Sequence, residues 1–354
     1  MEIFQSSLFY LGIFILVASA VPLIRHDFWI FRVFEYPRLQ KLFLNVLVIV
    51  LWCVFFTFAS LKDCIFIILM FSNAVYLCWL ILPFTVFSKK QIIQSRHAQG
   101  DKNIKLLIAN VYQENRKHRD YHQLINSCDP DLLLMVETNQ WWQDKMDSIG
   151  DVYPHQIKIP LENTYGMLLY SKLELIDGSV NYLVEDDIPS IEVDVRLPSG
   201  DIVKLFCLHP RPPVPQENPH STERDKEILL VAKKSRESKI PVIVIGDLND
   251  VAWSYTTELF SKISELLDPR KGRGFFNSFN AKYFFLRFPL DHVFCSADFT
   301  LSSIKRMNSC GSDHFPMCIN LQYDPKAEVV NEIPKADEED VTLFKEKVNA
   351  ETGS

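Results

Sequence analysis

The sequence lacks three features that would each point to a particular class of protein. Its eight cysteines have no metal-type CxxC spacing, and the five outside the apolar first quarter are an odd number, so we interpret them as buried thiols in a reducing compartment. Residues 1–7 contain Glu2 and neither Lys nor Arg, so the basic leading region of a cleaved signal peptide is missing. The chain also has no wide basic surface, so strong binding to long duplex DNA is not indicated.

The formal charge of −7 is unevenly distributed along the chain. From Asp324 onward there are nine Asp or Glu and four Lys, a net of −5, so residues 1–323 carry only −2. The acidic run at residues 337–340 is typical of a solvated segment. We therefore expect residues 324–354 to form an acidic tail that is disordered beyond a short helix and has no catalytic role.

Long apolar runs are concentrated in the first quarter of the chain. Three nearly uncharged segments are each close to the roughly 20 residues that cross a bilayer. The sequence therefore predicts a membrane region, residues 1–90, with transmembrane helices at about 8–24, 42–61 and 64–87. A buried helix pair in a soluble domain is the alternative for the last two segments.

Basic residues predict the orientation of these helices. The hairpin between the last two helices carries only Lys62. The first loop carries Arg25, Arg32, Arg38 and Lys41, and the stretch after the third helix carries Lys89, Lys90 and Arg96. By the positive-inside rule, the first loop and the large C-terminal part lie on the cytoplasmic side.

After a predicted linker at residues 91–102, residues 103–323 are enough for one α/β domain. Strand-like apolar runs occur at 104–112, 131–136, 167–170, 191–197, 202–208, 242–245, 291–294 and 317–321, and helical periodicity at 116–128, 222–238 and 256–267. Several strands are consecutive, which predicts stacked sheets with outer helices.

Polar side chains lie at the ends of six of these runs. They are Asn110, Glu137, His209, Asp247 with Asn249, Asp291, and Asp313 with His314. A single Asp near a strand end is usually a turn former. Together, however, carboxylates suit Mg²⁺, amides suit phosphate oxygens and imidazoles suit proton transfer. The set therefore predicts metal-dependent chemistry on a phosphate.

The strings that carry these residues resemble the endonuclease/exonuclease/phosphatase superfamily, most closely a bacterial membrane-anchored branch. They are Asn-Val-Tyr-Gln-Glu-Asn at 110–115, Asp-Pro-Asp-Leu at 129–132 leading to Glu137, His-Pro-Arg-Pro at 209–212, Gly-Asp-Leu-Asn-Asp at 246–250, Pro-Leu-Asp-His at 289–292 and Ser-Asp-His-Phe-Pro at 312–316. The resemblance implies a four-layered α/β sandwich of two mainly antiparallel sheets flanked by helices. It also implies a divalent metal, Mg²⁺ or alternatively Mn²⁺.

The resemblance also assigns roles to single residues. Glu137 is similar to the family's principal metal ligand, with Asn110 and Asp313 beside it. Asp247 matches the water-orienting aspartate and Asn249 the phosphate-binding amide. A separate group completes the site: His314 as base or phosphate contact, Asp291 as the carboxylate that holds this imidazole, and His209 as the second histidine. The choice between Asp247 and His314 as general base stays open.

Two positions near these strings are interpreted differently. Apurinic endonucleases have an acidic residue where this chain has Tyr112, which puts a second metal position in doubt and weakens a role in abasic-site repair. Strand alternation turns His292 away from Asp291, so we interpret His292 as structural.

The stretch at residues 269–289 interleaves basic and aromatic residues. This composition fits a loop that holds a phosphate and stacks a base, a loop that lies against an anionic membrane, or a loop pinned by packed aromatics.

These features predict a multi-pass protein of the bacterial inner membrane whose cytoplasmic domain is a Mg²⁺-dependent phosphoester hydrolase of phosphodiesterase or nuclease type. The expected partners are the lipid bilayer and a phosphoester substrate, which is a nucleic acid, a phospholipid headgroup or a small phosphoester. One alternative is a catalytically inactive membrane scaffold or binding protein that retains the fold. Another, within the enzymes, is a lipid or small-molecule phosphoesterase in place of a nuclease.

Overall fold

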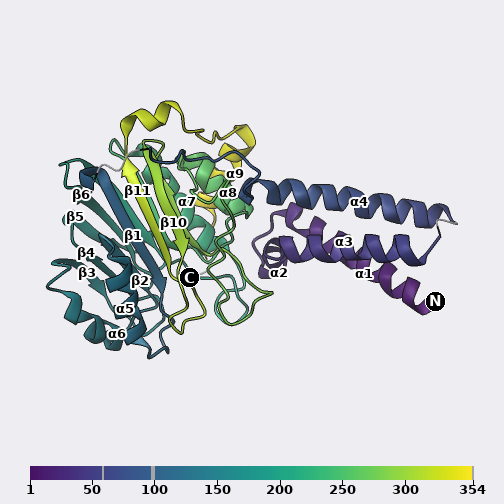
Figure 1. Cartoon of the computed structure of the whole chain (residues 1–354), viewed down its shortest axis with the longest axis horizontal. Helices are drawn as coiled ribbons and strands as arrows, with labels where there is room; N and C mark the ends of the chain where they lie inside the picture. The colour runs from purple at the N-terminus through teal and green to yellow at the C-terminus, as the bar shows by residue number, and fades with distance from the viewer. Residues whose placement is uncertain (58–59, 97–99, 353–354) are drawn as a thin grey trace.

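The structure is a computed structural model that describes residues 1–57, 60–96 and 100–352. Residues 58–59 of the second predicted membrane segment and residues 97–99 of the predicted linker lie outside this description. Three long apolar helices extend from a globular body (Figure 1): α1 (Glu2–Ala20), α3 (Arg38–Phe55) and α4 (Leu61–Ile81). Four short helical elements join or follow them: η1 (Val21–Ile24), α2 (Trp29–Arg32), η2 (Val33–Glu35) and η3 (Leu82–Phe84).

The three long helices have the length and composition of membrane spans. Mean hydropathy is 2.3 over Glu2–Ile24, 1.8 over Arg38–Phe55 and 2.4 over Leu61–Phe84. They pack on one another through a small apolar core that includes Ile15, Trp52 and Met70. Inside this bundle the Asn73 amide donates to Asn45 Oδ1 at 2.9 Å, which satisfies two polar groups that would be costly to expose to lipid.

The globular body contains two mixed sheets stacked face to face. The six-stranded sheet has the order β10-β11-β1-β2-β4-β3 and the five-stranded sheet the order β5-β6-β7-β8-β9. The strands are β1 (Asn103–Asn110), β2 (Leu132–Val136), β3 (His155–Ile159), β4 (Met167–Ser171), β5 (Glu174–Asn181), β6 (Ser190–Arg196), β7 (Ile202–Leu208), β8 (Val242–Asp247), β9 (Asp291–Cys295), β10 (Phe299–Arg306) and β11 (Met317–Tyr323). Alternate apolar residues of both sheets form the core between them.

Helices cover the outer face of each sheet (Figure 1). The six-stranded sheet carries α5 (His118–Cys128), α6 (Gln140–Met146) and η5 (Asp147–Ile149), and the five-stranded sheet carries α7 (Thr222–Glu237) and α8 (Tyr255–Ser264). Each outer helix buries an apolar stripe on its sheet, as Leu124 does from α5 and Phe260 from α8. The predicted sandwich of two sheets flanked by helices is confirmed.

The segments on either side of the sandwich also pack against it. After η4 (Gly100–Lys102) the chain enters β1, and earlier Ser95 N–H donates to Leu301 O on β10 at 3.0 Å, so part of the predicted linker lies along a sheet edge. The C-terminal segment contains η6 (Pro325–Val329) and α9 (Glu338–Asn349). We expected residues 324–354 to be disordered beyond a short helix; in the structure, Phe344 and Val348 of α9 pack against the helical layer of α7 and α8.

The topology brings many strand ends to one end of the sandwich. Each sheet contains one parallel pair, β1–β2 in the first and β7–β8 in the second. Parallel strands have their carboxyl ends at the same edge of a sheet, and strands antiparallel to them begin at that edge. β11 is antiparallel to β1 and β9 to β8, so the starts of β11 and β9 join the ends of the four parallel strands.

Candidate active site

Asn110, the last residue of β1, links the two sheets. Its amide nitrogen donates to Glu137 Oε1 at 2.7 Å and to Asp247 Oδ2 at 3.0 Å. Its Oδ1 accepts the Tyr112 N–H at 3.0 Å, which fixes the orientation of the amide. One side chain therefore contacts the carboxylate that follows β2 and the carboxylate that ends β8.

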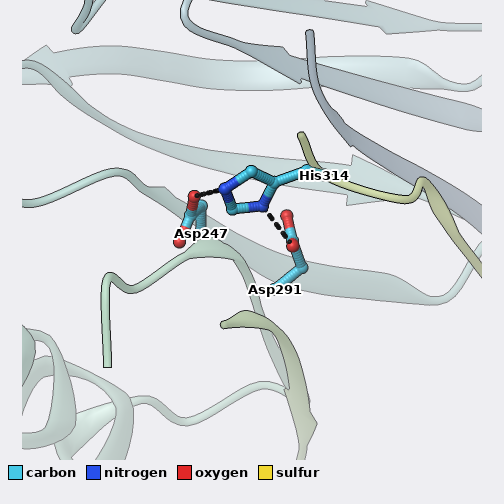
Figure 2. Close-up of side chains that lie close together, drawn as sticks. All are labelled: Asp247, Asp291 and His314. Carbon is cyan, nitrogen blue, oxygen red and sulfur yellow. Dashed lines mark hydrogen bonds and ion pairs between the residues drawn. The ribbon is translucent and has the colours of Figure 1, made fainter. Parts of the chain in front are cut away.

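His314 lies between two carboxylates, as Figure 2 shows. Its Nδ1 is 2.8 Å from Asp291 Oδ2, and its Nε2 is 3.5 Å from Asp247 Oδ2. Burial opposes protonation, but the charges of Asp291 and Asp247 outweigh it and raise the pKa of His314 to about 10. Both ring nitrogens therefore carry protons at neutral pH.

Glu137 stands directly after β2 in a left-handed conformation, with φ of 58°. Such a conformation is strained for a residue with a side chain, and strain of this kind concentrates at functional sites. Burial raises its pKa to about 7, although the His314 charge and the Asn110 hydrogen bond act in the opposite direction. Asp247 and Asp313 raise it further, so the cost of burying the carboxylate is not offset by His314 and Asn110.

The tight string at residues 246–250 positions Asp247 and Asn249. At Gly246 (φ 147°) a Cβ atom would lie 1.9 Å from Leu208 O on β7, so only glycine fits this close approach. Asn249 is left-handed, with φ of 49°, and its N–H donates to Asp247 Oδ1 at 3.0 Å. Its side-chain amide donates to Pro210 O at 2.9 Å, which places it beside the segment that carries His209.

His209 follows β7 and is almost completely buried. Its Nδ1 has no hydrogen-bond partner among the residues that the structure describes, and its ring lies 5.4 Å from the Tyr165 ring. Burial lowers its pKa to about 4 despite the Asp247 charge, so its imidazole is neutral at pH 7.

Two other residues of the family motifs, His292 and Arg211, have different contacts. His292 accepts from Arg270 Nη2 at 2.7 Å through Nδ1 and contacts Asp250 O at 2.8 Å through Nε2. It therefore supports the back of the site, in keeping with a structural role. Arg211 forms an ion pair with Glu185 at 3.2 Å.

The loop at residues 269–289 borders the site and divides into two parts. Its base is packed: the Phe279 ring lies 4.9 Å from the His314 ring, and Ala281 N–H donates to Asp313 O at 2.6 Å. Its tip, residues 282–287, exposes Phe284 (68%) and Phe285 (79%). Because Gln40 on the first turns of α3 donates to Phe285 O at 2.6 Å, this tip lies beside the apolar helices.

The donor set fits a hard divalent cation. Asp247, Asp291 and His314 bring ligand atoms within 4.8 Å of one another, and Asp291 Oδ1 is buried without a hydrogen-bond partner in the described part of the chain. His314, however, neutralises charge within that group. A second group of carboxylates surrounds Glu137, where the charges of Asp247 and Asp313 act on it, and carboxylate oxygens are ligands that a hard cation prefers.

Comparisons with known proteins agree with this architecture. Residues 103–314, more than half of the chain, match the model of the Endonuclease/Exonuclease/phosphatase family, so the chain belongs to this family and is an enzyme of the phosphoester-hydrolysing class. No curated protein sequence matches it significantly.

Solved structures share the fold at low sequence identity. D. rerio TDP2 complexed with single strand DNA product is 14% identical, with a TM-score of 0.53 over 63% of this chain and 100% of that chain. An endonuclease/exonuclease/phosphatase family protein from Bacteroides thetaiotaomicron is 17% identical, with a TM-score of 0.53 over 63% of this chain and 96% of that chain.

Several further residues shape the site. Tyr165 packs on His209, and the Ser278 hydroxyl accepts the Asp291 N–H at 3.0 Å. Ser312 Oγ accepts the His314 N–H at 2.9 Å and so fixes the turn before β11. Ser312 lies in a motif of the family resemblance and could have been proposed as a turn residue. Tyr165 lies in a loop without a distinctive pattern, and the basic and aromatic pattern of residues 269–289 does not single out Ser278.

Proposed function

We propose that this enzyme is a Mg²⁺-dependent phosphoester hydrolase that is anchored in the bacterial inner membrane, with its catalytic domain in the cytoplasm. The observation that carries the proposal is the junction at Asn110, which holds Glu137 and Asp247 together beside the His314–Asp291 pair. Residues from both sheets thus form one acidic centre, as a metal-assisted hydrolase requires.

In this proposal Glu137, Asn110 and Asp313 hold the metal. When bound, the ion neutralises charge that develops on the phosphoryl oxygens. Asp247 orients the attacking water, and Asn249, His209 and His314 surround the phosphoryl group. Asp291 holds the His314 ring through the 2.8 Å contact.

The protonation of His314 favours one division of labour between the two possible bases. A ring with a raised pKa and two N–H groups is suited to donate a hydrogen bond to a phosphoryl oxygen. Asp247 is acceptor-only when ionised and lies beside it, so we assign the positioning of water to Asp247.

The exposed aromatic tip supports a second candidate, a substrate at the bilayer surface. Phe284 and Phe285 project beside helices that have the composition of membrane spans, and Lys282 and Arg287 flank them. Aromatic and basic side chains are the groups that favour a lipid–water interface. A lipid phosphoester is therefore the second candidate substrate class, beside the nuclease-type substrate.

The test uses the full chain in lipid nanodiscs with a generic phosphodiester, bis(p-nitrophenyl) phosphate. Glu137→Gln and His314→Ala should each lower kcat by about 10²–10³-fold. Glu174→Gln, an exposed carboxylate on β5, is the matched control and should retain full activity. Wild-type rates in both site variants would contradict the proposal.

Two further measurements separate the alternatives. Calorimetric titration with Mg²⁺ and Mn²⁺ should show binding that depends on Glu137, whereas a scaffold that lost catalysis would show none. A substrate panel with DNA, RNA, sphingomyelin, inositol phosphates and nucleotides, each with and without EDTA, then identifies the phosphoester.

A further inference from the structure

The loop between α1 and α3 is docked on the catalytic domain behind the string at residues 246–250. We define the docked loop as residues 27–38. Its backbone pairs with the segment before α7, where Ser221 N–H donates to Asp27 O at 2.9 Å and Trp29 N–H donates to Pro219 O at 2.8 Å. Further along, Trp253 Nε1 donates to Glu35 O at 2.9 Å, so the loop contacts the chain on both sides of the string.

Arg32 makes the central contact of the docked loop. Its guanidinium is buried and reaches Asp250 Oδ2 at 3.2 Å, Glu35 Oε1 at 3.2 Å and Thr256 Oγ1 at 3.1 Å. It also lies 4.0 Å above the Tyr255 ring. Because Asp250 is the last residue of the string, Arg32 fixes the point where the string turns away from the site.

Tyr36 contacts the string at Asn249. Its hydroxyl donates to Asn249 O at 3.1 Å, and Arg224 Nη1 from α7 donates to the same oxygen at 2.8 Å. Asn249 is in a left-handed conformation that surrounding contacts must maintain. Two donors on one carbonyl provide such contacts.

We propose that the docked loop is a positioning element of the hydrolytic site, in which Tyr36 and Arg32 hold the string from behind so that Asp247 and Asn249 keep their working geometry. The kinetic part of this inference rests on the proposed function. The helical N-terminal region is then part of the catalytic architecture as well as an anchor, and a fragment that begins after α4 lacks the support.

The test compares Tyr36→Phe with wild type in the full chain in nanodiscs. This change removes one hydroxyl and keeps the ring, so folding is retained. We expect kcat on bis(p-nitrophenyl) phosphate to fall about three- to tenfold, the effect of one lost hydrogen bond, with KM changed less than about twofold. Tyr10→Phe, at an exposed tyrosine of α1, is the matched control and should leave both constants unchanged.

A second readout does not depend on catalysis. Hydrogen exchange measured by mass spectrometry should become faster in the peptide around residues 246–252 of Tyr36→Phe, and unchanged in β1. Arg32→Lys keeps the charge but loses the forked contacts, so it should accelerate exchange in the same peptide. Unchanged exchange and unchanged kcat in both variants would overturn the inference. Faster exchange in a chain that hydrolyses no phosphoester would support the docking and refute only the proposed function.

Discussion

Asp247 and Asp250 lie three residues apart in one string, yet their surroundings are opposite. Asp247 faces the site, where the Asn110 amide and the His314 ring are its neighbours and Asp291 and Glu137 add negative charge. Asp250 faces the docked loop, where Arg32 and Arg224 each approach its Oδ2 at 3.2 Å and Ser254 Oγ donates at 2.6 Å. One string thus separates an acidic centre from a neutralised network.

Two buried aspartates, Asp247 in the site and Asp225 in the network around Arg32, have pKa values shifted in opposite directions. On the site side, burial raises the pKa of Asp247 and raises that of Glu137 to about 7, because nearby cations do not compensate. In the network around Arg32, burial likewise raises the pKa of Glu35 to about 7, but for Asp225 on α7 the charges of Arg32 and Arg224 outweigh burial and hold the pKa well below the ordinary range. The first environment is suited to accept a cation and the second already contains its own, so site and support are distinguished by charge balance.

The largest expected effect separates Asp247 from Asp250 by activity. Asp247→Asn should lower kcat by about 10²–10³-fold, because the amide cannot replace the acceptor that orients water. Its unfolding temperature should stay equal to wild type or rise, since a buried carboxylate with a raised pKa is removed. Rate assays and thermal unfolding in nanodiscs measure both, with Asp144→Asn on the surface of α6 as the control. Full activity in Asp247→Asn would contradict the role of Asp247 in orienting water.

Asp250→Asn should show the reverse pattern. The change leaves Arg32 and Arg224 without a carboxylate at the string, and breaking a buried ion pair costs about 3–5 kcal/mol. Denaturant titration of the detergent-solubilised chain measures this loss, and the folded fraction should still bind the metal. An Asp250→Asn chain as stable as wild type would show that the network does not support the fold.

Much of the fold was predictable because the buried faces of strands and helices require apolar residues at regular spacing in the sequence. All eight strand-like runs correspond to strands, and the three strands that were not expected, β3, β5 and β10, are edge strands. Edge strands have one unpaired side and carry more polar residues, as in β5, so the apolar signal is weak. In α9, Leu343 and Phe344 supply the apolar contact that the acidic composition concealed.

The site residues were easier to predict from the sequence than the docked loop that contacts them from behind. Short strings located the polar strand ends, and the topology brings Asn110, Glu137, Asp247, Asp291 and His314 into contact; their roles stay predictions. The docked loop could not be predicted, because its partners are about two hundred positions away in sequence. Arg32, which we counted as a signal of membrane orientation, is a buried partner of Asp250 and Glu35.

Metal binding should change the stability of the chain by an intermediate amount. Mg²⁺ at about 100 times its Kd should stabilise the wild-type chain by about 2.7 kcal/mol, provided that it binds only the folded state. Asp250→Asn should retain this increment and Glu137→Gln should lose it. Unfolding measured with Mg²⁺ and with EDTA gives the increment for each variant. Loss of the increment in Asp250→Asn but not in Glu137→Gln would place the cation on the wrong side of the string.

The smallest expected effect is the acid sensitivity of the neutralised network. A carboxyl whose folded-state pKa is depressed contributes stability that is complete above its unfolded value, about 3.9, and is lost as the pH falls toward the folded value. Asp225 is such a group, because Arg32 and Arg224 overcome the cost of its burial. Below about pH 4 the wild-type chain should therefore lose roughly 1.4 kcal/mol per pH unit more than Asp225→Asn, which cannot titrate there. Denaturant titrations of both chains between pH 5 and pH 3 measure the difference in slope. Equal slopes would mean that Asp225 is not held ionised by the two arginines, and the contrast in charge balance across the string would lose its physical basis.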